Sequence, residues 1–118
     1  MKNALLLLAA LSATTGCVMT LAEVRQEVVP TQATMARPPM GAASCVARNI
    51  ENTADLTWGV HPGYVREGNK PGTAELSVPP ALAADFEPSG NGSTATIYVS
   101  PNLLSVYTDR YLGAFKGC

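Results

Sequence analysis

The sequence predicts a small α+β domain, in which one helix near the start of the domain and one at its end pack on a small antiparallel sheet. Three observations predict this fold class. Apolar residues recur three and four positions apart in residues 43–54 and again in residues 104–115, which is the spacing of a helix with one apolar face. Between these segments, short stretches alternate apolar and polar residues, as strands with one buried face do. Strands grouped between helices are typical of α+β folds.

The first predicted helix starts near Gly41 and has one apolar face. Its apolar residues stand three or four positions apart, at Ala43, Val46, Ala47, Ile50 and Ala54. Residues 56–60 then alternate and predict a short strand, which the turn-forming His61-Pro62-Gly63 ends. Residues 64–67 are expected to return as its partner strand, and residues 68–72 form a loop by composition.

Two further strands are predicted after this loop. Apolar and polar residues alternate in residues 74–78, a half-buried strand that Pro79-Pro80 terminates. The alternation is clearest in residues 94–100, and the Asn91-Gly92 pair just before them is a hairpin signal. The partner strand in this hairpin is either a segment around residues 84–87 or the strand at 74–78, and the sequence does not choose between them.

A terminal helix is predicted after Pro101. Its large residues recur at helical spacing, at Leu104, Tyr107, Tyr111 and Phe115, with Asn102 as a candidate N-cap and Gly117 near its end. If this helix and the first one pack on the same side of the sheet, Cys45 and Cys118 come close together.

The N-terminal residues have the pattern of a secretory leader. Lys2 supplies a positive charge, residues 4–11 form an apolar run too short to span a bilayer, and small or hydroxylated residues follow. The segment Thr14-Thr15-Gly16-Cys17 resembles the lipobox of bacterial lipoprotein precursors, in which a small residue precedes the cysteine that receives lipid. Thr14 departs from the pattern, because the family usually has an aliphatic residue there. The resemblance covers residues 1–17 only.

The resemblance implies a signal peptide at residues 1–16 and a membrane anchor through lipid on the cysteine that follows. In this family an aspartate after the cysteine commonly retains the protein in the inner membrane; Val18 stands there instead, which implies the periplasmic face of the outer membrane. Residues 17–42 are rich in small residues and prolines and are expected to form a lipidated flexible tether, with at most a brief helix at residues 21–29. The globular domain would then span residues 43–118. A plain secretory leader, which would give a secreted or free periplasmic protein, is the alternative.

Lipid on Cys17 would leave Cys45 and Cys118 as an even pair in an oxidising compartment, where we expect them to form a disulfide. Such a bridge would close a long loop and stabilise the domain by roughly 4 kcal/mol on the chain-entropy model. Two free buried thiols are the alternative, and thiol counting with and without reductant separates the two cases.

No residue constellation in the sequence specifies catalysis, a metal or a cofactor. His61 is the only histidine and lies in a predicted turn, no serine stands in a Gly-x-Ser-x-Gly motif, and no two cysteines form a Cys-x-x-Cys pair. The acidic residues are dispersed, whereas metal ligands cluster. Eight Lys and Arg residues against nine Asp and Glu residues are scattered singly, so no basic surface for nucleic acid is indicated. We therefore expect no enzyme activity, no metal or cofactor, and no nucleic-acid partner.

Aromatic side chains are the remaining candidates for binding. Trp58, Tyr64 and Tyr98 are amphipathic residues of the kind enriched at protein interfaces, and the alternation around Tyr98 turns it away from the apolar face of its strand. The competing interpretation is that the aromatic residues form the core of a domain with few large aliphatic residues, namely Trp58, Tyr107, Tyr111 and Phe115.

Three function classes follow from these observations. We expect a non-catalytic interaction module of the cell envelope, anchored by lipid and binding an envelope protein. The second class is an inhibitor or immunity protein that blocks an enzyme such as a cell-wall hydrolase, or a toxin. The third is a small secreted enzyme, which would require His61 or a pair of carboxylates to converge in a pocket.

Overall fold

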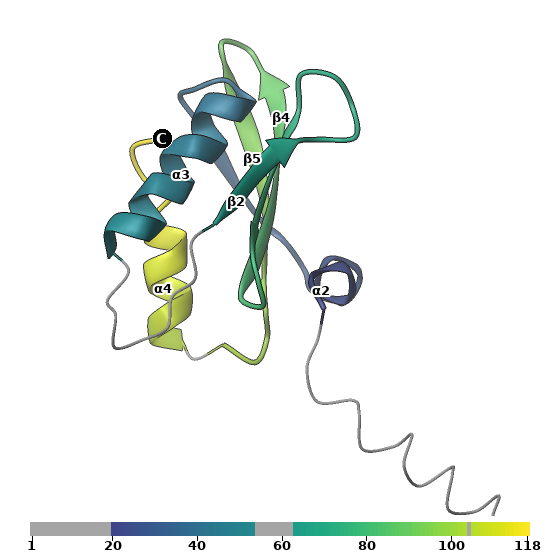
Figure 1. Cartoon of the computed structure of the whole chain (residues 1–118), viewed down its shortest axis with the longest axis vertical. Helices are drawn as coiled ribbons and strands as arrows, with labels where there is room; N and C mark the ends of the chain where they lie inside the picture. Colours follow the sequence, from purple (N-terminus) through teal and green to yellow (C-terminus); the bar gives the residue numbers. More distant parts are fainter. Residues whose placement is uncertain (1–19, 54–62, 104) are drawn as a thin grey trace, which may run out of the picture.

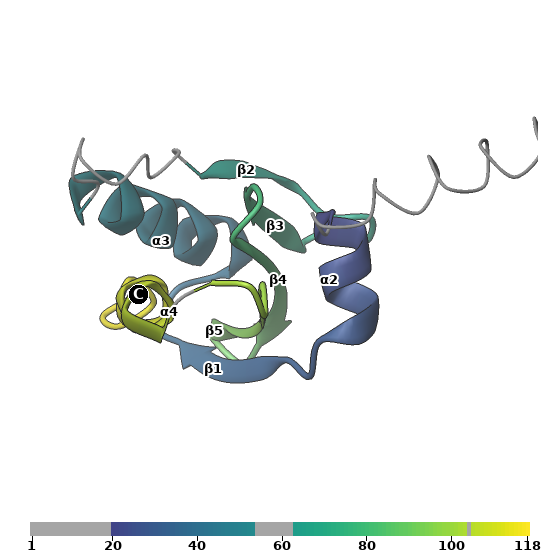
Figure 2. The ribbon, with the colours of Figure 1, turned by 90° about the horizontal axis from the view of Figure 1, so that it is seen from below.

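The computed structural model describes residues 20–53, 63–103 and 105–118, and these residues form one sheet with helices on both of its faces (Figures 1 and 2). The predicted strand at residues 56–60, with Trp58, and the turn residues His61 and Pro62 lie outside the described residues, as do residues 1–19. The elements follow in the order α2 (Leu21–Glu27), β1 (Thr31–Met35), α3 (Pro39–Thr53), β2 (Tyr64–Glu67), β3 (Ala74–Val78), β4 (Leu82–Ser89), β5 (Gly92–Val99) and α4 (Ser105–Gly113).

The five strands are antiparallel and lie in the order β1-β5-β4-β3-β2, so that β1 and β2 form the two edges. Strands β2 to β5 are a meander of consecutive hairpins, whereas β1 precedes α3 in the chain and joins the sheet beside β5. Helices α3 and α4 cover one face and α2 crosses the other (Figure 2). The predicted α+β class, with the first and last helices of the predicted domain on the same face of the sheet, is confirmed.

Helix α3 follows the predicted periodicity. Pro39 occupies its first position, where a missing N–H leaves no intrahelical hydrogen bond unmade. Of the residues that the spacing selected, Ala43 and Val46 are 0% exposed, Ile50 is 1% exposed and Ala47 is half-buried, whereas Ala54 lies outside the described residues. This helix therefore supplies one side of the core.

The core lies between the sheet and the two helices α3 and α4. Period-two alternation places Leu76, Phe86 and Ile97 on this face of three neighbouring strands, and all three are buried. The ring of Phe86 stacks on that of Phe115, just after α4, with ring centroids 6.1 Å apart. Tyr111 and Phe115 are buried as the core interpretation of the aromatic residues predicted, and Tyr107 is half-buried against the same cluster.

The hairpin before β5 is confirmed, and its partner is β4, the nearer of the two candidates. Its turn, however, is centred one residue earlier than the Asn91-Gly92 signal indicated. Ser89 pairs with Gly92, and the residue with positive φ is Gly90, at 59°. Gly92 is needed for a different reason: a Cβ there would overlap the carbonyl oxygen of Met35, where β1 runs beside β5.

The expected flexible tether is wrong for the described residues 20–42. Thr20 caps α2 by accepting a hydrogen bond from the backbone N–H of Glu23, and Val24 is fully buried against the sheet. The next residues form β1, which pairs along its whole length with β5. The prolines that suggested a linker stand at element boundaries, before β1 and before or at the start of α3, where they break no regular hydrogen bonding.

Strand β3 is more buried than the predicted half-buried strand, because four of its five residues are buried. Glu75 faces away from the core and is nevertheless only 8% exposed. Its carboxylate accepts a 2.7 Å hydrogen bond from Arg66 of β2, the residue directly opposite it in the register. The alternating pattern therefore identified the strand and missed the burial of its polar face.

Candidate interaction site

The two edge strands of the sheet differ in how well they are protected against pairing with another chain. An edge strand presents unpaired backbone N–H and C=O groups, and proteins commonly protect such edges with short strands and charged side chains. Strand β2 has four residues, of which Arg66 and Glu67 are charged. Strand β1 has the five-residue sequence Thr-Gln-Ala-Thr-Met and no charge. Among the described strands, β1 is therefore the edge that is open to strand addition.

A shallow apolar groove of about 440 Å³ lies beside β1, between this strand and the segment that follows α4. Its apolar floor comes from Ala33 on β1 and Ile97 on β5, together with Leu112 of α4 and Phe115 just after this helix. Because Ala33 and Ile97 lie on the helix-bearing face of the sheet, a strand added beside β1 would turn alternate side chains toward this groove. The full lining comprises Thr31, Ala33, Thr34, Ala36, Ile97, Leu112, Phe115, Lys116, Gly117 and Cys118.

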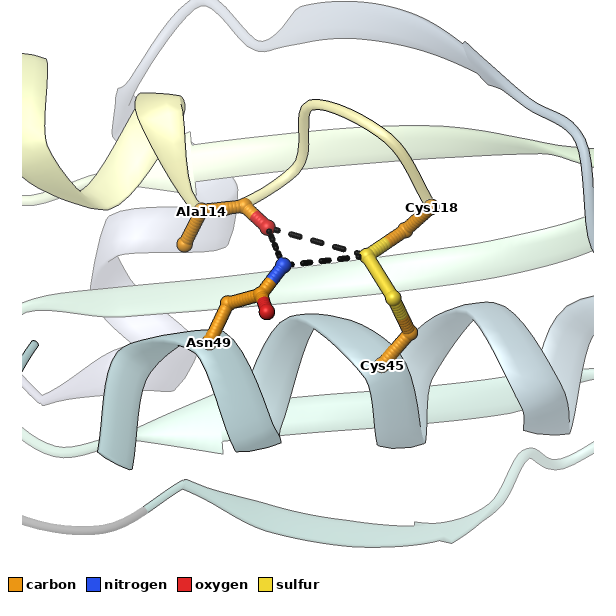
Figure 3. Close-up of a disulfide and its surroundings, with 4 residues drawn as sticks. All are labelled: Cys45, Asn49, Ala114 and Cys118. Atoms are coloured by element: carbon orange, nitrogen blue, oxygen red, sulfur yellow. Dashed lines mark hydrogen bonds between the residues drawn. A yellow bond between two sulfur atoms is a disulfide. The ribbon is translucent and has the colours of Figure 1, made fainter. Parts of the chain in front are cut away.

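The wall formed by the C-terminal segment is fixed to the rest of the domain by a disulfide (Figure 3). Cys45 on α3 is bonded to Cys118, which confirms the predicted pair, and both residues are buried. The side-chain amide of Asn49, one turn further along α3, donates a 2.9 Å hydrogen bond to the carbonyl oxygen of Ala114. The backbone N–H of Arg37 donates a 3.1 Å hydrogen bond to the carbonyl oxygen of Cys118. These contacts hold the groove wall beside β1.

The charged side chain that lines the groove is the exposed Lys116. No carboxylate side chain is among the lining residues. A segment that binds here would therefore meet an apolar floor with one exposed lysine at its rim.

The predicted binding tyrosines lie on the opposite face of the sheet and do not form one surface. Tyr64 pairs with Ser77, Ser77 with Ala83 and Ala83 with Tyr98, so both tyrosines belong to one row across the sheet. Three strand spacings separate them, roughly 14 Å. Tyr64 is 65% exposed and Tyr98 is partly buried, whereas Ala83 between them is fully buried. Trp58, the third candidate, lies outside the described residues.

The same face carries a paired set of charges beside α2. The guanidinium of Arg25 lies 2.8 Å from a carboxylate oxygen of Asp85, and Arg66 lies 2.7 Å from Glu75. Burial raises the pKa of the Asp85 carboxyl above its ordinary value, the nearby Arg25 opposes that shift, and the Glu75 and Glu87 carboxylates add to it. A polar pocket of about 280 Å³ lies here.

These acidic side chains do not form a metal site: in the ranges that the structure covers, no three His, Cys, Asp or Glu side chains are placed to hold a metal ion. The Arg25–Asp85 ion pair instead joins α2 to β4, and the Arg66–Glu75 ion pair joins β2 to β3.

The groove beside β1 was missed from the sequence, because residues 31–35 were interpreted as tether. The alternation of Ala33 and Met35 with Gln32 and Thr34 was the available signal, and it is short and only weakly apolar.

Within the described ranges, none of the helices combines the length and apolarity required to cross a bilayer. Comparison of the chain with protein-family models, with curated proteins and with solved structures finds no match.

Proposed function

We propose that this chain is a non-catalytic interaction module of the bacterial cell envelope, which binds an extended segment of an envelope protein as an added strand beside β1. The observation that supports this proposal is the combination of an uncharged edge strand and an apolar groove on the same side of the domain. Lipid on Cys17 would hold the module at the periplasmic face of the outer membrane.

Strand addition divides affinity and selectivity between two parts of the site. Outward-facing backbone groups of β1 would pair with the backbone of the segment, each hydrogen bond contributing about 0.5–1.5 kcal/mol net. One apolar side chain of the segment would enter the groove over Ala33, Ile97 and Phe115, contributing roughly 1.5–3 kcal/mol if fully buried. The preferred ligand is therefore a segment of about five residues with an apolar side chain at its centre.

The binding proposal is tested with a displayed library of random heptapeptides, selected on the processed protein purified in detergent from a Gram-negative host. Selected peptides should carry alternating apolar residues and should slow amide hydrogen exchange in residues 31–35, because strand addition protects outward-facing amides. Ala33→Lys, which places a long charged side chain in the groove, should abolish binding. Glu67→Lys, which adds a lysine at the other edge strand, should leave binding intact.

Three outcomes of this selection would overturn the proposal. One is that bound peptide slows amide hydrogen exchange only around Tyr64 and Tyr98 and leaves residues 31–35 unprotected. Another is the absence of any selected peptide. The third is that amide exchange in β1 slows as the protein concentration rises, without peptide, while the mass of the protein in solution doubles. This result would identify a second copy of the chain as the occupant of the edge. Circular dichroism of Ala33→Lys separates loss of binding from loss of folding.

The anchoring proposal has its own test. Intact mass and membrane partitioning of the protein expressed in a Gram-negative host should show residues 17–118 carrying a lipid-sized mass. A Cys17→Ser variant should be soluble or unprocessed. Release of the wild-type protein without lipid would refute the anchor and favour the secreted alternative, while leaving the binding proposal to its own experiment.

A further inference from the structure

The hydrogen-bonding phase of β5 decides which backbone groups of β1 remain unpaired. In an antiparallel sheet, one residue directs its N–H and C=O toward one neighbouring strand, and the next residue directs both toward the other. The N–H of Ser100, just after β5, donates a 2.8 Å hydrogen bond to the carbonyl oxygen of Ala81, just before β4. Even-numbered residues of β5 therefore face β4, and the residues that direct their backbone groups toward β1 are Ser93, Ala95 and Ile97.

The register carries this alternation across to β1. The β5 residues that face β1 lie opposite its odd-numbered residues, Thr31, Ala33 and Met35, whose backbone groups are therefore used within the sheet. Gln32 and Thr34 direct their N–H and C=O groups outward instead, so the free edge offers four groups at these two positions. Pro30 has the same phase but no N–H to offer.

We propose that the segment bound at this edge runs antiparallel to β1 and places one large apolar side chain opposite Ala33. The proposal rests on the strand addition proposed above. The ligand residues opposite Gln32 and Thr34 exchange hydrogen bonds with all four outward groups, so three consecutive ligand residues satisfy the edge. A parallel segment needs about five residues to reach the same groups, because its hydrogen bonds slant between residues. The antiparallel arrangement therefore orders a shorter segment and costs less conformational entropy.

The pleat of the sheet directs the central ligand side chain into the groove. Ala33 lies on the helix-bearing face, and side chains directly opposite each other in an antiparallel pair share a face. The ligand residue opposite Ala33 is in a non-hydrogen-bonded pair, in which the two Cα atoms are only about 4.5 Å apart. Because alanine is small, the groove of about 440 Å³ is open at this position to a Leu, Met or Phe side chain.

A second copy of this chain does not supply such a side chain from its own β1. The two-fold register that pairs Gln32 of one copy with Thr34 of the other places the two Ala33 side chains opposite each other. A shift of this register by two residues brings Thr31 or Met35 opposite Ala33. Thr31 is short and polar, and Met35 is only 3% exposed because it is packed in the core of its own domain. The occupant is therefore a segment of another protein.

The phase of β1 is tested in the protein without ligand, by residue-resolved amide hydrogen exchange in NMR spectra of the processed protein in detergent. Gln32 and Thr34 should exchange at least about tenfold faster than Ala33, because only the Ala33 amide is directed toward β5. Equal exchange rates, or faster exchange of Ala33, would overturn the assignment of the outward groups.

The direction is tested with the tightest-binding heptapeptide from the selection described above, in which an alanine scan identifies the groove residue. N-methylation of either neighbour of that residue should weaken binding at least about tenfold, because a hydrogen bond to β1 is lost. N-methylation of the groove residue itself should change the affinity less than about threefold, because its N–H points away from β1. The reverse pattern would identify a parallel segment and overturn the proposed direction, while strand addition itself would stand.

The register is tested by exchanging side-chain size between the protein and the peptide. Ala33→Leu should weaken binding of the parent peptide at least about tenfold and should favour the peptide that carries alanine at the groove residue. Gln32→Leu, on the opposite face of β1, is the matched control and should leave both affinities within about threefold. An unchanged preference of Ala33→Leu for the parent peptide would overturn the register. Selection of no binding peptide would instead refute the proposed function on which the register and direction rest.

Discussion

Removing the disulfide between Cys45 and Cys118 should strongly destabilise this domain. Cys45 and Cys118 are 73 positions apart in the sequence, so the bridge restricts a loop that includes most of the sheet. The chain-entropy model then assigns to its removal a loss of roughly 4 kcal/mol in the free energy of unfolding. A domain of this size commonly has only about 5–15 kcal/mol in total, and each kcal/mol shifts the melting temperature by about 4–8 °C.

The variant that tests this figure is Cys45→Ala/Cys118→Ala in a Cys17→Ser background, which avoids new thiols. Urea unfolding followed by circular dichroism should give the loss of roughly 4 kcal/mol, together with a steeper denaturant dependence, because the unfolded chain is no longer cross-linked. The parent with Cys17→Ser alone, measured with and without reductant, is the control: reduction should reproduce the effect of the double substitution. A difference below about 1 kcal/mol would refute the reasoning, and would mean that the core packing of Phe115 and the hydrogen bonds of Asn49 and Arg37 hold the C-terminal segment without the bridge.

The remaining predictions concern α2 and the charges that attach it. Val24→Ala should lower the free energy of unfolding by about 1.5 kcal/mol in urea titrations, because it removes buried methyl groups between α2 and the sheet; no change would show that α2 is not packed in solution. Burial raises the pKa of the Asp85 carboxyl, so the native state keeps this proton at a higher pH than the unfolded state does. The contribution of Asp85 to the free energy of unfolding should therefore fall as the pH rises from the ordinary Asp pKa through the raised pKa. Carbon-13 NMR titration of the Asp85 carboxyl, with urea unfolding of wild type and Asp85→Asn across this pH range, checks the sign; a midpoint at or below the ordinary value would contradict it.

The sequence was most informative where one strong pattern determined the element. Helix α3 and strand β5 were predicted because helical spacing and strand alternation are local patterns, whereas β4 was one of two open candidates for the partner of β5. The disulfide was predicted from an even cysteine pair in an oxidising compartment. The position of the hairpin turn was wrong by one residue. Asn-Gly is a strong local signal, but the register across β4 and β5 placed Gly90 at the position that needs positive φ and used Gly92 for close approach to β1.

Before α3, strand β1 was missed and α2 was expected only as a brief helix within a tether, because the stability of both elements comes from long-range contacts. Strand β1 pairs with β5, which lies some sixty residues later in the chain, so local alternation over five mostly polar residues could not reveal it. Helix α2 has only seven residues and buries Val24 fully, which leaves almost no periodicity to detect. The candidate site shares this difficulty, since its groove combines β1 with the segment after α4.

The same prolines that suggested a tether bear on how an open edge can be tolerated. An unprotected edge strand invites aggregation as well as specific binding, and the risk grows with the length of edge that another strand can pair with. Pro30 stands immediately before β1, and Pro38 and Pro39 follow it closely, so regular pairing along this edge is confined to about the five residues 31–35. A short edge of this kind gives few backbone hydrogen bonds to any strand that adds to it. Specific binding must then depend on the side chain that enters the groove, and the Cys45–Cys118 bridge that fixes the groove wall is expected to control partner affinity as well as stability.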